Sequence, residues 1–241
     1  MKKLFNISKL IFSVALGLIL VASCSSDDDS STSTQGPNTF NLIEVTNGAL
    51  NVEVKPTFSW SAATSPDGSP VTYDLYLDTN NPPTTKVASN LTNTIYTVQS
   101  NLEYGEIYNW KVVATNSQGS TTSQTASFKT RLATNADLLI GKWFFDSIVN
   151  PQDPDPTILT DCFKTSFLQF SGTTMTQVMY DLNTDEDCEI TANLQRPYEL
   201  INNTIIQVTQ TDGSLIQIPI ISISENTLVI ADGSAQLTLK K

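Results

Sequence analysis

The stretch Tyr73-Asp74-Leu75-Tyr76-Leu77 places apolar side chains at every second position, and Tyr108-Asn109-Trp110-Lys111-Val112 repeats this alternation. Successive side chains of a strand point to opposite faces of a sheet, so both stretches predict strands with one buried and one solvated face. Hardly any segment of the 241 residues shows helical periodicity, and turn-forming residues separate the short apolar runs. We therefore expect an all-β protein.

Without residues 1–23 the chain has 218 residues, a length that predicts two small domains. We place the linker between them at residues 132–136. A β-sandwich is expected over residues 39–131, with strands at 40–45, 57–60, 71–77, 94–98, 107–114 and 121–128. A small antiparallel β-barrel is expected over residues 137–241, with strands at 142–149, 163–170, 174–180, 188–192, 198–201, 204–209, 215–223, 227–230 and 236–239. Asp-Gly pairs at 212–213 and 232–233 are strong hairpin signals, and a closed barrel leaves no exposed edge.

The first domain contains Pro56-Thr57-Phe58-Ser59-Trp60 near its start. This stretch resembles strand B of a fibronectin type III domain, with Trp60 as the central core aromatic residue. Leu102 and, six positions later, Tyr108 resemble the tyrosine corner, in which a phenol caps the chain before the next strand. The chain has no Arg-Gly-Asp sequence, so we expect this domain to be a spacer that holds the second domain away from a membrane.

The second domain has Gly141-Lys142-Trp143 at its start, a mid-domain cysteine pair and a closing Leu237-Thr238-Leu239. In these features it resembles the short lipocalin-like domains of bacterial lipoproteins. The resemblance implies a barrel that either encloses one small ligand or fills its interior with side chains. The residues that could line or fill the interior are Trp143, Phe145, Leu168, Phe170, Ile216, Ile218, Leu228 and Leu237, of which Trp143, Phe145 and Phe170 are the candidate ligand-binding residues. Because the domain is short, we expect a filled or nearly filled barrel.

The N-terminus has the pattern of a secretory signal peptide over residues 1–23, with basic residues before an apolar run too short to cross a bilayer. Val21-Ala22-Ser23-Cys24 resembles a bacterial lipobox, which implies that Cys24 becomes the lipid-modified N-terminus and anchors the chain in a membrane. A secreted protein with a thiol at Cys24 is the alternative. Residues 24–38 are expected to be a flexible acidic and Ser/Thr-rich linker. Its Asp27-Asp28-Asp29 resembles the export tag of cell-surface lipoproteins, or merely keeps the linker extended.

The remaining cysteines, Cys162 and Cys188, are an even pair in an exported chain and predict a disulfide, although two free thiols are the alternative.

The chain without residues 1–23 is strongly acidic. It keeps 10 of the 13 basic residues and all 24 acidic residues, which gives a formal net charge of −14. Such a surface repels phosphate, so no nucleic-acid partner is expected.

The segment Asp181–Asp187 has side-chain oxygen atoms at alternate positions, as calcium-binding loops do. A calcium loop of the EF-hand type also needs Gly at its sixth position and Glu at its twelfth, where this chain has Glu186 and Ala192. We therefore expect an acidic hairpin tip and no metal site.

The chain contains no histidine, which excludes the His-dependent nucleophilic triads and zinc-protease motifs. No catalytic residues and no cofactor are expected. We predict a non-enzymatic lipoprotein of the outer membrane, exposed at the cell surface, whose barrel binds a small apolar molecule or a glycan. One alternative is an accessory subunit with a surface protein partner; another is a polysaccharide hydrolase that uses two carboxylates.

Overall fold

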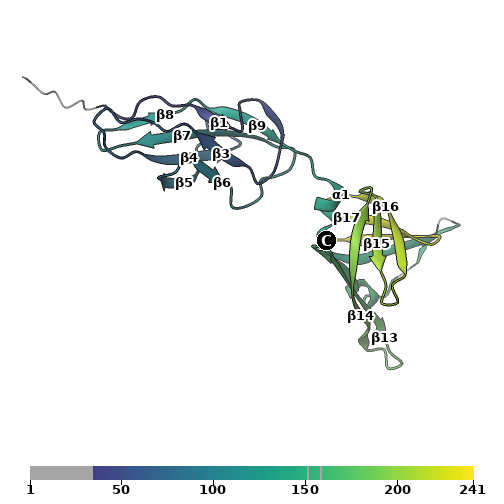
Figure 1. Cartoon of the computed structure of the whole chain (residues 1–241). Coiled ribbons are helices and arrows are strands. Elements are labelled where there is room, and N and C mark those ends of the chain that lie inside the picture. Colours follow the sequence, from purple (N-terminus) through teal and green to yellow (C-terminus); the bar gives the residue numbers. More distant parts are fainter. Residues whose placement is uncertain (1–34, 151, 158) are drawn as a thin grey trace, which may run out of the picture.

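The computed structural model describes residues 35–150, 152–157 and 159–241; the predicted signal peptide and Cys24 lie outside the described residues. Two β-domains follow each other and are joined by the short helix α1 (Asn135–Leu139) (Figure 1). A sandwich precedes an antiparallel barrel, so the predicted fold class is confirmed. In the described part of the chain, no helix combines the length and the apolar character needed to span a membrane.

The first domain consists of two packed sheets. One sheet has the order β1-β3-β6, and the other has the order β2-β9-β7-β4-β5 with β8 paired to β7. The strands are β1 (Leu42–Glu44), β2 (Ala49–Val52), β3 (Thr57–Trp60), β4 (Thr72–Asp78), β5 (Lys86–Leu91), β6 (Ile95–Thr97), β7 (Ile107–Thr115), β8 (Ser120–Thr122) and β9 (Ala126–Thr130). The end of the predicted linker packs on this domain, because Pro37 is buried and the Asn38 amide donates to the Thr64 carbonyl at 2.8 Å.

The alternating strands form the core of the sandwich as their pattern predicted. Every second residue of β4 is buried, and Trp60 lies against Tyr73 in an edge-to-face contact with ring centroids 5.6 Å apart. The Tyr73 hydroxyl accepts a hydrogen bond from the Ala63 amide at 2.9 Å. The Tyr108 hydroxyl accepts one from the Glu103 amide at 3.1 Å. The predicted tyrosine corner is therefore confirmed.

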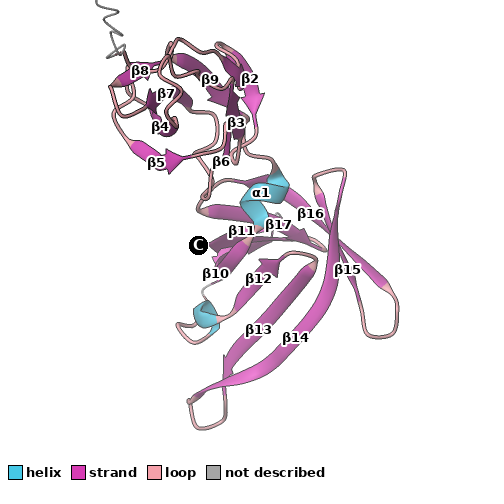
Figure 2. Ribbon diagram, turned by 60° about the vertical axis from the view of Figure 1, so that its left-hand side comes forward, coloured by secondary structure: helices cyan, strands magenta, loops and turns pink. Residues whose placement is uncertain are grey.

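The second domain is an up-and-down barrel that closes where β10 pairs with β18 (Figure 2). Within the described residues, its eight wall strands are β10 (Gly141–Asn150), β12 (Phe167–Ser171), β13 (Thr174–Leu182), β14 (Cys188–Ile201), β15 (Ile205–Thr209), β16 (Leu215–Ile223), β17 (Thr227–Asp232) and β18 (Ala235–Lys240). The strand β11 (Asp153–Thr157) pairs with β10 and lies between the expected strands at 142–149 and 163–170, where no strand was expected.

Two further boundaries differ from the sequence prediction. Residues 188–192 and 198–201 were expected to be separate strands, but β14 is continuous because it changes partners near Pro197. Up to that residue β14 pairs with β13, and from Tyr198 onward it pairs with β15. The expected strand at 163–170 begins as the 3₁₀ helix η1 (Phe163–Thr165), and β12 starts only at Phe167.

One end of the barrel is closed by α1 and by the Gly-Xaa-Trp sequence. Gly141 has φ +127°, a conformation that favours glycine, and it turns the chain from α1 into β10. The fully buried Trp143 donates its indole N–H to the Leu139 carbonyl at 2.7 Å. On the same side, Lys241 Nζ lies 4.5 Å from the Trp143 ring centroid and donates to the Leu138 carbonyl at 2.9 Å. Burial lowers the pKa of Lys241.

A disulfide between Cys162 and Cys188 confirms the predicted pairing. Cys162 precedes η1, and Cys188 opens β14. The bond therefore ties the segment before β12 to the β13–β14 hairpin beside its turn.

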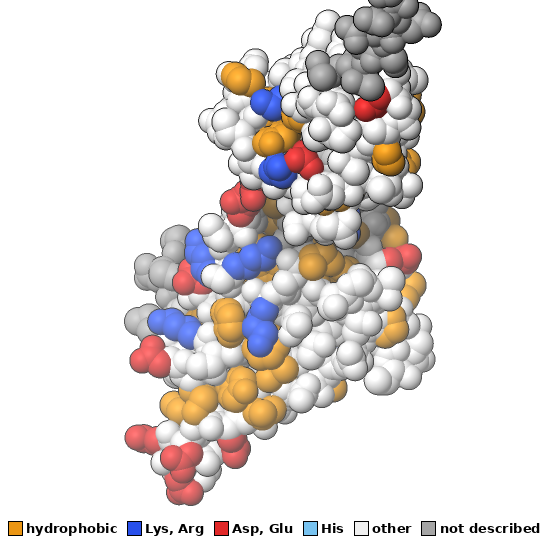
Figure 3. All heavy atoms as spheres, turned by 90° about the vertical axis from the view of Figure 1, so that its left-hand side faces the viewer, with side chains coloured by type: hydrophobic (Ala, Val, Ile, Leu, Met, Phe, Trp, Pro, Cys, Tyr) orange, Lys and Arg blue, Asp and Glu red, His pale blue; other side chains and the backbone are white. Residues whose placement is uncertain are grey.

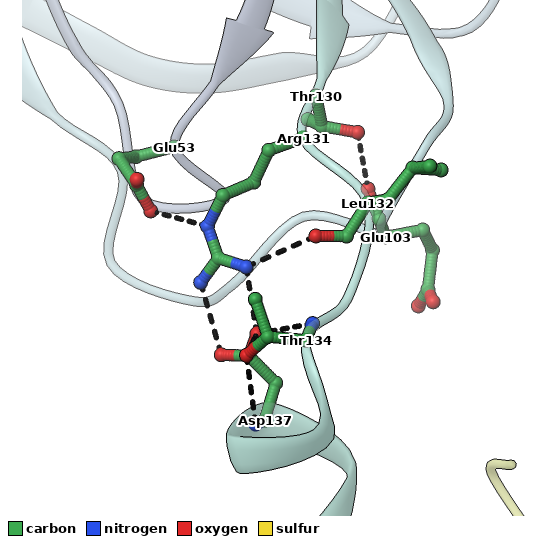
Figure 4. A network of polar contacts seen from close by, with 7 residues as sticks. All are labelled: Glu53, Glu103, Thr130, Arg131, Leu132, Thr134 and Asp137. Atoms are coloured by element: carbon green, nitrogen blue, oxygen red, sulfur yellow. Dashed lines mark hydrogen bonds and ion pairs between the residues drawn. The ribbon is translucent and has the colours of Figure 1, made fainter. Parts of the chain in front are cut away.

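A polar network around Arg131 joins the two domains (Figure 4). The guanidinium makes a bidentate contact with Asp137 of α1, with N–O distances of 2.6 and 2.9 Å, and Nε donates to Glu53 of the sandwich at 2.7 Å. The Tyr104 ring lies 5.1 Å from the guanidinium carbon. The hydrogen bonds from Arg131 hold the pKa of Asp137 well below its usual range.

Asp137 also fixes the start of α1. Its carboxylate accepts from the Thr134 amide at 2.8 Å, while the Thr134 hydroxyl accepts from the Asp137 amide at 3.3 Å, which is a capping box. The Asn135 side chain donates to the carbonyl of Asn203 at 2.8 Å. Asn202 and Asn203, both at positive φ, form the turn between β14 and β15. Arg131, α1 and this turn thus connect the sandwich to the barrel wall.

Removing the disulfide should destabilise the barrel. The bond closes a separation of 26 residues, and the chain-entropy model gives about 3.5 kcal/mol for such a loop. The double variant Cys162→Ala/Cys188→Ala should therefore lose about that much unfolding free energy in urea titration. Reduction of the wild type should produce the same loss, whereas equal stability of the variant and the wild type would contradict the prediction.

The Asp137–Arg131 pair should contribute to stability in a pH-dependent way. Because the folded-state pKa of Asp137 is depressed, its contribution is complete above the unfolded value of about 3.9 and is lost as the pH falls toward the folded-state pKa. Asp137→Asn should cost about 1 kcal/mol at pH 7, and urea titrations should show the difference from wild type shrinking below pH 4. Asp146→Asn, at an exposed position of β10, is the control and should change little; a difference that does not depend on pH would contradict the prediction.

Candidate functional site

The barrel contains a cavity of about 190 Å³. Side chains from all around the barrel wall line this cavity: Phe145, Leu168, Met175, Gln177, Arg196, Val208, Gln210, Ile216, Ile218, Ile230, Asp232 and Leu237.

Each of the eight wall strands, β10 and β12 to β18, thus contributes at least one side chain to the cavity. The floor and walls are apolar, with Phe145, Met175, Val208 and Ile230 all buried. The inward positions recur at every second residue of a strand, as in Ile216 and Ile218 of β16. The cavity therefore follows directly from the alternation of the wall strands.

Four polar side chains interrupt this apolar lining: Gln177, Arg196, Gln210 and Asp232. Asp232 is exposed at the end of β17, and the other three are partly buried. An apolar pocket with a few polar groups is the usual form of a small-molecule site.

Two further hollows, of about 200 and 310 Å³, lie on the sandwich, but no charged residue lines either of them. The barrel cavity is therefore the candidate functional site.

Arg196 is the basic residue of this lining. Its Nη1 donates to Gln177 Oε1 at 3.2 Å, which joins neighbouring strands β14 and β13. Its Nε is shielded from solvent and has no hydrogen-bond partner among the described residues. None of the ion pairs between described residues includes Arg196, although Asp232 also lines the cavity. The guanidinium thus keeps donor capacity beside an apolar space.

The three predicted ligand-binding residues have different positions. Phe145 lines the cavity, whereas Trp143 and Phe170 are not among the lining residues and are almost completely buried, at 0% and 1% exposure. Trp143 closes the barrel near α1, and Phe170 packs edge-to-face on Tyr198 with ring centroids 5.1 Å apart. Burial raises the pKa of Tyr198. Trp143 and Phe170 therefore belong to the packed core next to the cavity and do not line it.

The expected filled barrel describes only part of the interior. Trp143, Phe170 and Leu228 belong to the packed core near α1, as a filled barrel requires. Leu168, Ile216, Ile218 and Leu237 instead line the cavity. The interior is thus divided into a packed end and a hollow region.

The acidic β13–β14 hairpin tip has the geometry of a turn. Asn183 Oδ1 accepts from the amides of Asp185 and Asp187, both at 2.9 Å. Figure 3 shows acidic side chains gathered at the end of the barrel that lies farthest from the sandwich. Within the described residues, no group of three or more His, Cys, Asp and Glu side chains is placed to hold a metal ion.

Sequence reasoning missed Gln177, Arg196, Gln210 and Asp232. Arg196 lies in the stretch 193–197, where polar residues hide the alternation of β14 and no strand was expected. The available signal was its position two residues before Tyr198, because residues two apart on a strand share a face. Continuing the pattern of Tyr198 and Leu200 backwards places Arg196 on the inner face.

Comparisons with known proteins agree with the two-domain fold. Residues 139–230 match the lipocalin-like domain family, and residues 42–134 match the Rha78A-like, N-terminal immunoglobulin domain family. The chain is therefore an immunoglobulin-like domain followed by a lipocalin-like antiparallel barrel. The first domain had been expected to resemble fibronectin type III, which shares the sandwich architecture of immunoglobulin domains. No curated protein matches the chain.

Solved structures similar to the chain are distant in sequence. A lipocalin-like protein from Bacteroides uniformis is 13% identical over 43% of this chain and 98% of that chain, with a TM-score of 0.33. An uncharacterized protein from Bacteroides eggerthii is 12% identical over 43% of this chain and 98% of that chain, with a TM-score of 0.32. The alpha-L-rhamnosidase from Dictyoglumus thermophilum is 14% identical over 86% of this chain but 30% of its own, with a TM-score of 0.33.

Proposed function

We propose that this protein is a non-enzymatic binding module, in which the barrel cavity takes up a small, mainly apolar molecule. The observation that carries the proposal is the cavity of about 190 Å³ inside a barrel whose other end is packed. Burying apolar ligand surface against Phe145, Val208 and Ile230 supplies the driving force. These apolar walls favour an apolar molecule over the glycan considered from the sequence.

The volume limits the size of the ligand. A protein cavity of about 150 Å³ lined by apolar side chains binds benzene, whereas pockets for drug-sized molecules span about 300–1,000 Å³. The barrel cavity lies between these sizes. We therefore propose a ligand whose buried part is about as large as one aromatic ring or a short acyl group.

In this proposal the immunoglobulin-like domain is a spacer that presents the barrel. The Arg131 network supports this role, because one guanidinium contacts Glu53 of the sandwich and Asp137 of α1. The side chains of Arg131 and Asp137 are 24% and 18% exposed, so the contact is partly protected from solvent. A spacer joined in this way carries the barrel in a preferred orientation.

We further propose that Cys24 anchors the protein in the outer membrane and that the module faces the outside of the cell. The support is the sequence alone: a basic and apolar leader, small residues before Cys24, and an acidic segment after it. The order of anchor, linker, sandwich and barrel would place the cavity farthest from the membrane.

Narrowing the cavity should prevent ligand uptake. Ile216 and Ile221 lie on the same strand and are 47% and 48% exposed, but only Ile216 lines the cavity. Ile216→Trp should therefore weaken the binding of a small hydrophobic fluorophore at least tenfold, while Ile221→Trp should bind like the wild type. Fluorescence titration measures both affinities. Equal effects of the two variants, or no uptake by the wild type, would contradict the proposed site.

Changing the proposed anchor should release the protein. Cells fed a clickable fatty acid should label the wild type, and detergent partitioning should recover it in the detergent phase. Cys24→Ala should incorporate no label and remain in the aqueous phase, because the acylated thiol is absent. Ser23→Ala retains a small residue before Cys24 and should still be labelled. Label on Cys24→Ala would show that the lipid is attached elsewhere.

A further inference from the structure

We infer that the barrel selects ligands that carry a carboxylate, which Arg196 binds while the apolar part of the ligand fills the cavity. This inference rests on the proposed function and specifies its ligand class. The residues that carry it are Arg196 and Gln177, together with the apolar walls that they adjoin. The ligand class is a small amphipathic monocarboxylate.

The first argument is the unused donor capacity of Arg196. A guanidinium offers five N–H donors in a planar fork that matches a carboxylate. Between described residues, one hydrogen bond is formed, from Nη1 to Gln177, and Nε is shielded from solvent without a partner. Leaving a buried donor on a charged group without a partner is costly. A small rotation of the guanidinium toward a bound carboxylate would satisfy this donor.

The second argument is the position of the charge. Arg196 pairs with Met175 in the β13–β14 ladder, and both residues line the cavity. The buried Met175 belongs to the apolar core, so the guanidinium lies at a boundary between polar and apolar lining. A ligand with one anionic end and one apolar end matches this boundary. A neutral hydrocarbon would leave the Arg196 donors unused.

Asp232 is the counterargument, because a second charge of opposite sign lines the same cavity. It forms no ion pair with Arg196 within the described residues. Asp232 is exposed at the end of β17, where water screens its repulsion of an anion. Its presence predicts that Asp232→Asn strengthens carboxylate binding, which distinguishes this reading from recognition of a cation.

Three probes of nearly the same shape test the inference: 3-phenylpropionate, its neutral amide 3-phenylpropanamide, and the cation 3-phenylpropan-1-amine. Calorimetric or NMR titration of the wild type should show the carboxylate binding about tenfold more tightly than the amide, since hydrogen bonds to charged groups are the stronger class. In a ¹⁵N spectrum, the Nε–H signal of Arg196 should shift farther with the carboxylate than with the amide.

Arg196→Gln should abolish the preference for the carboxylate over the amide, and an unchanged circular dichroism spectrum shows that the variant is folded. Lys142→Gln removes the same charge from an exposed position of β10 and should keep the carboxylate preference. Equal binding of carboxylate and amide to the wild type would overturn the inference but leave the proposed function standing. Tightest binding of the amine would overturn it in favour of Asp232. No binding of any probe would overturn both.

Discussion

The hydrogen bond from the Trp143 indole to the Leu139 carbonyl is the contact around which the barrel is organised. It is completely buried, and it joins the first wall strand to the last residue of α1. An indole N–H buried without a partner would cost the free energy of desolvation. The contact requires a sharp turn between α1 and β10, which Gly141 supplies at positive φ. In the Gly-Xaa-Trp sequence, Gly141 thus makes the turn and Trp143 makes the buried hydrogen bond that together hold α1 against one end of the barrel.

This arrangement places the packed core and the cavity at different ends of one small domain. Around Trp143, the interior is packed by Ile206, Leu228 and Leu239, each with no exposed surface. In the rest of the barrel the wall side chains enclose a cavity, so the interior there is not close-packed. Cavities are destabilising, so the packed end and the disulfide compensate for the hollow region. The barrel remains closed because β10 pairs with both β12 and β18.

Where residues alternate cleanly, sequence predicted structure well. The alternation of β4 and β7, the tyrosine corner and the tight turns of the barrel were all expected, because each depends on local spacing or on one turn-forming residue. The continuity of β14 was not expected, since the polar residues at 193–197 hide its alternation and its partner change depends on tertiary pairing. Arg196 was missed for the same reason. An inward polar residue disrupts the very pattern that identifies a strand, and such exceptions concentrate at functional sites.

The position of α1 determines which way the cavity opens. The turn at Asn203 contacts α1, and β15 runs from that turn toward Gln210, which lines the cavity. The hollow part of the barrel therefore lies away from the helix that joins it to the sandwich. A ligand of the proposed kind would enter the cavity from this distal end. A protein docked on the immunoglobulin-like domain would leave that end of the barrel uncovered, so both domains could be occupied at the same time.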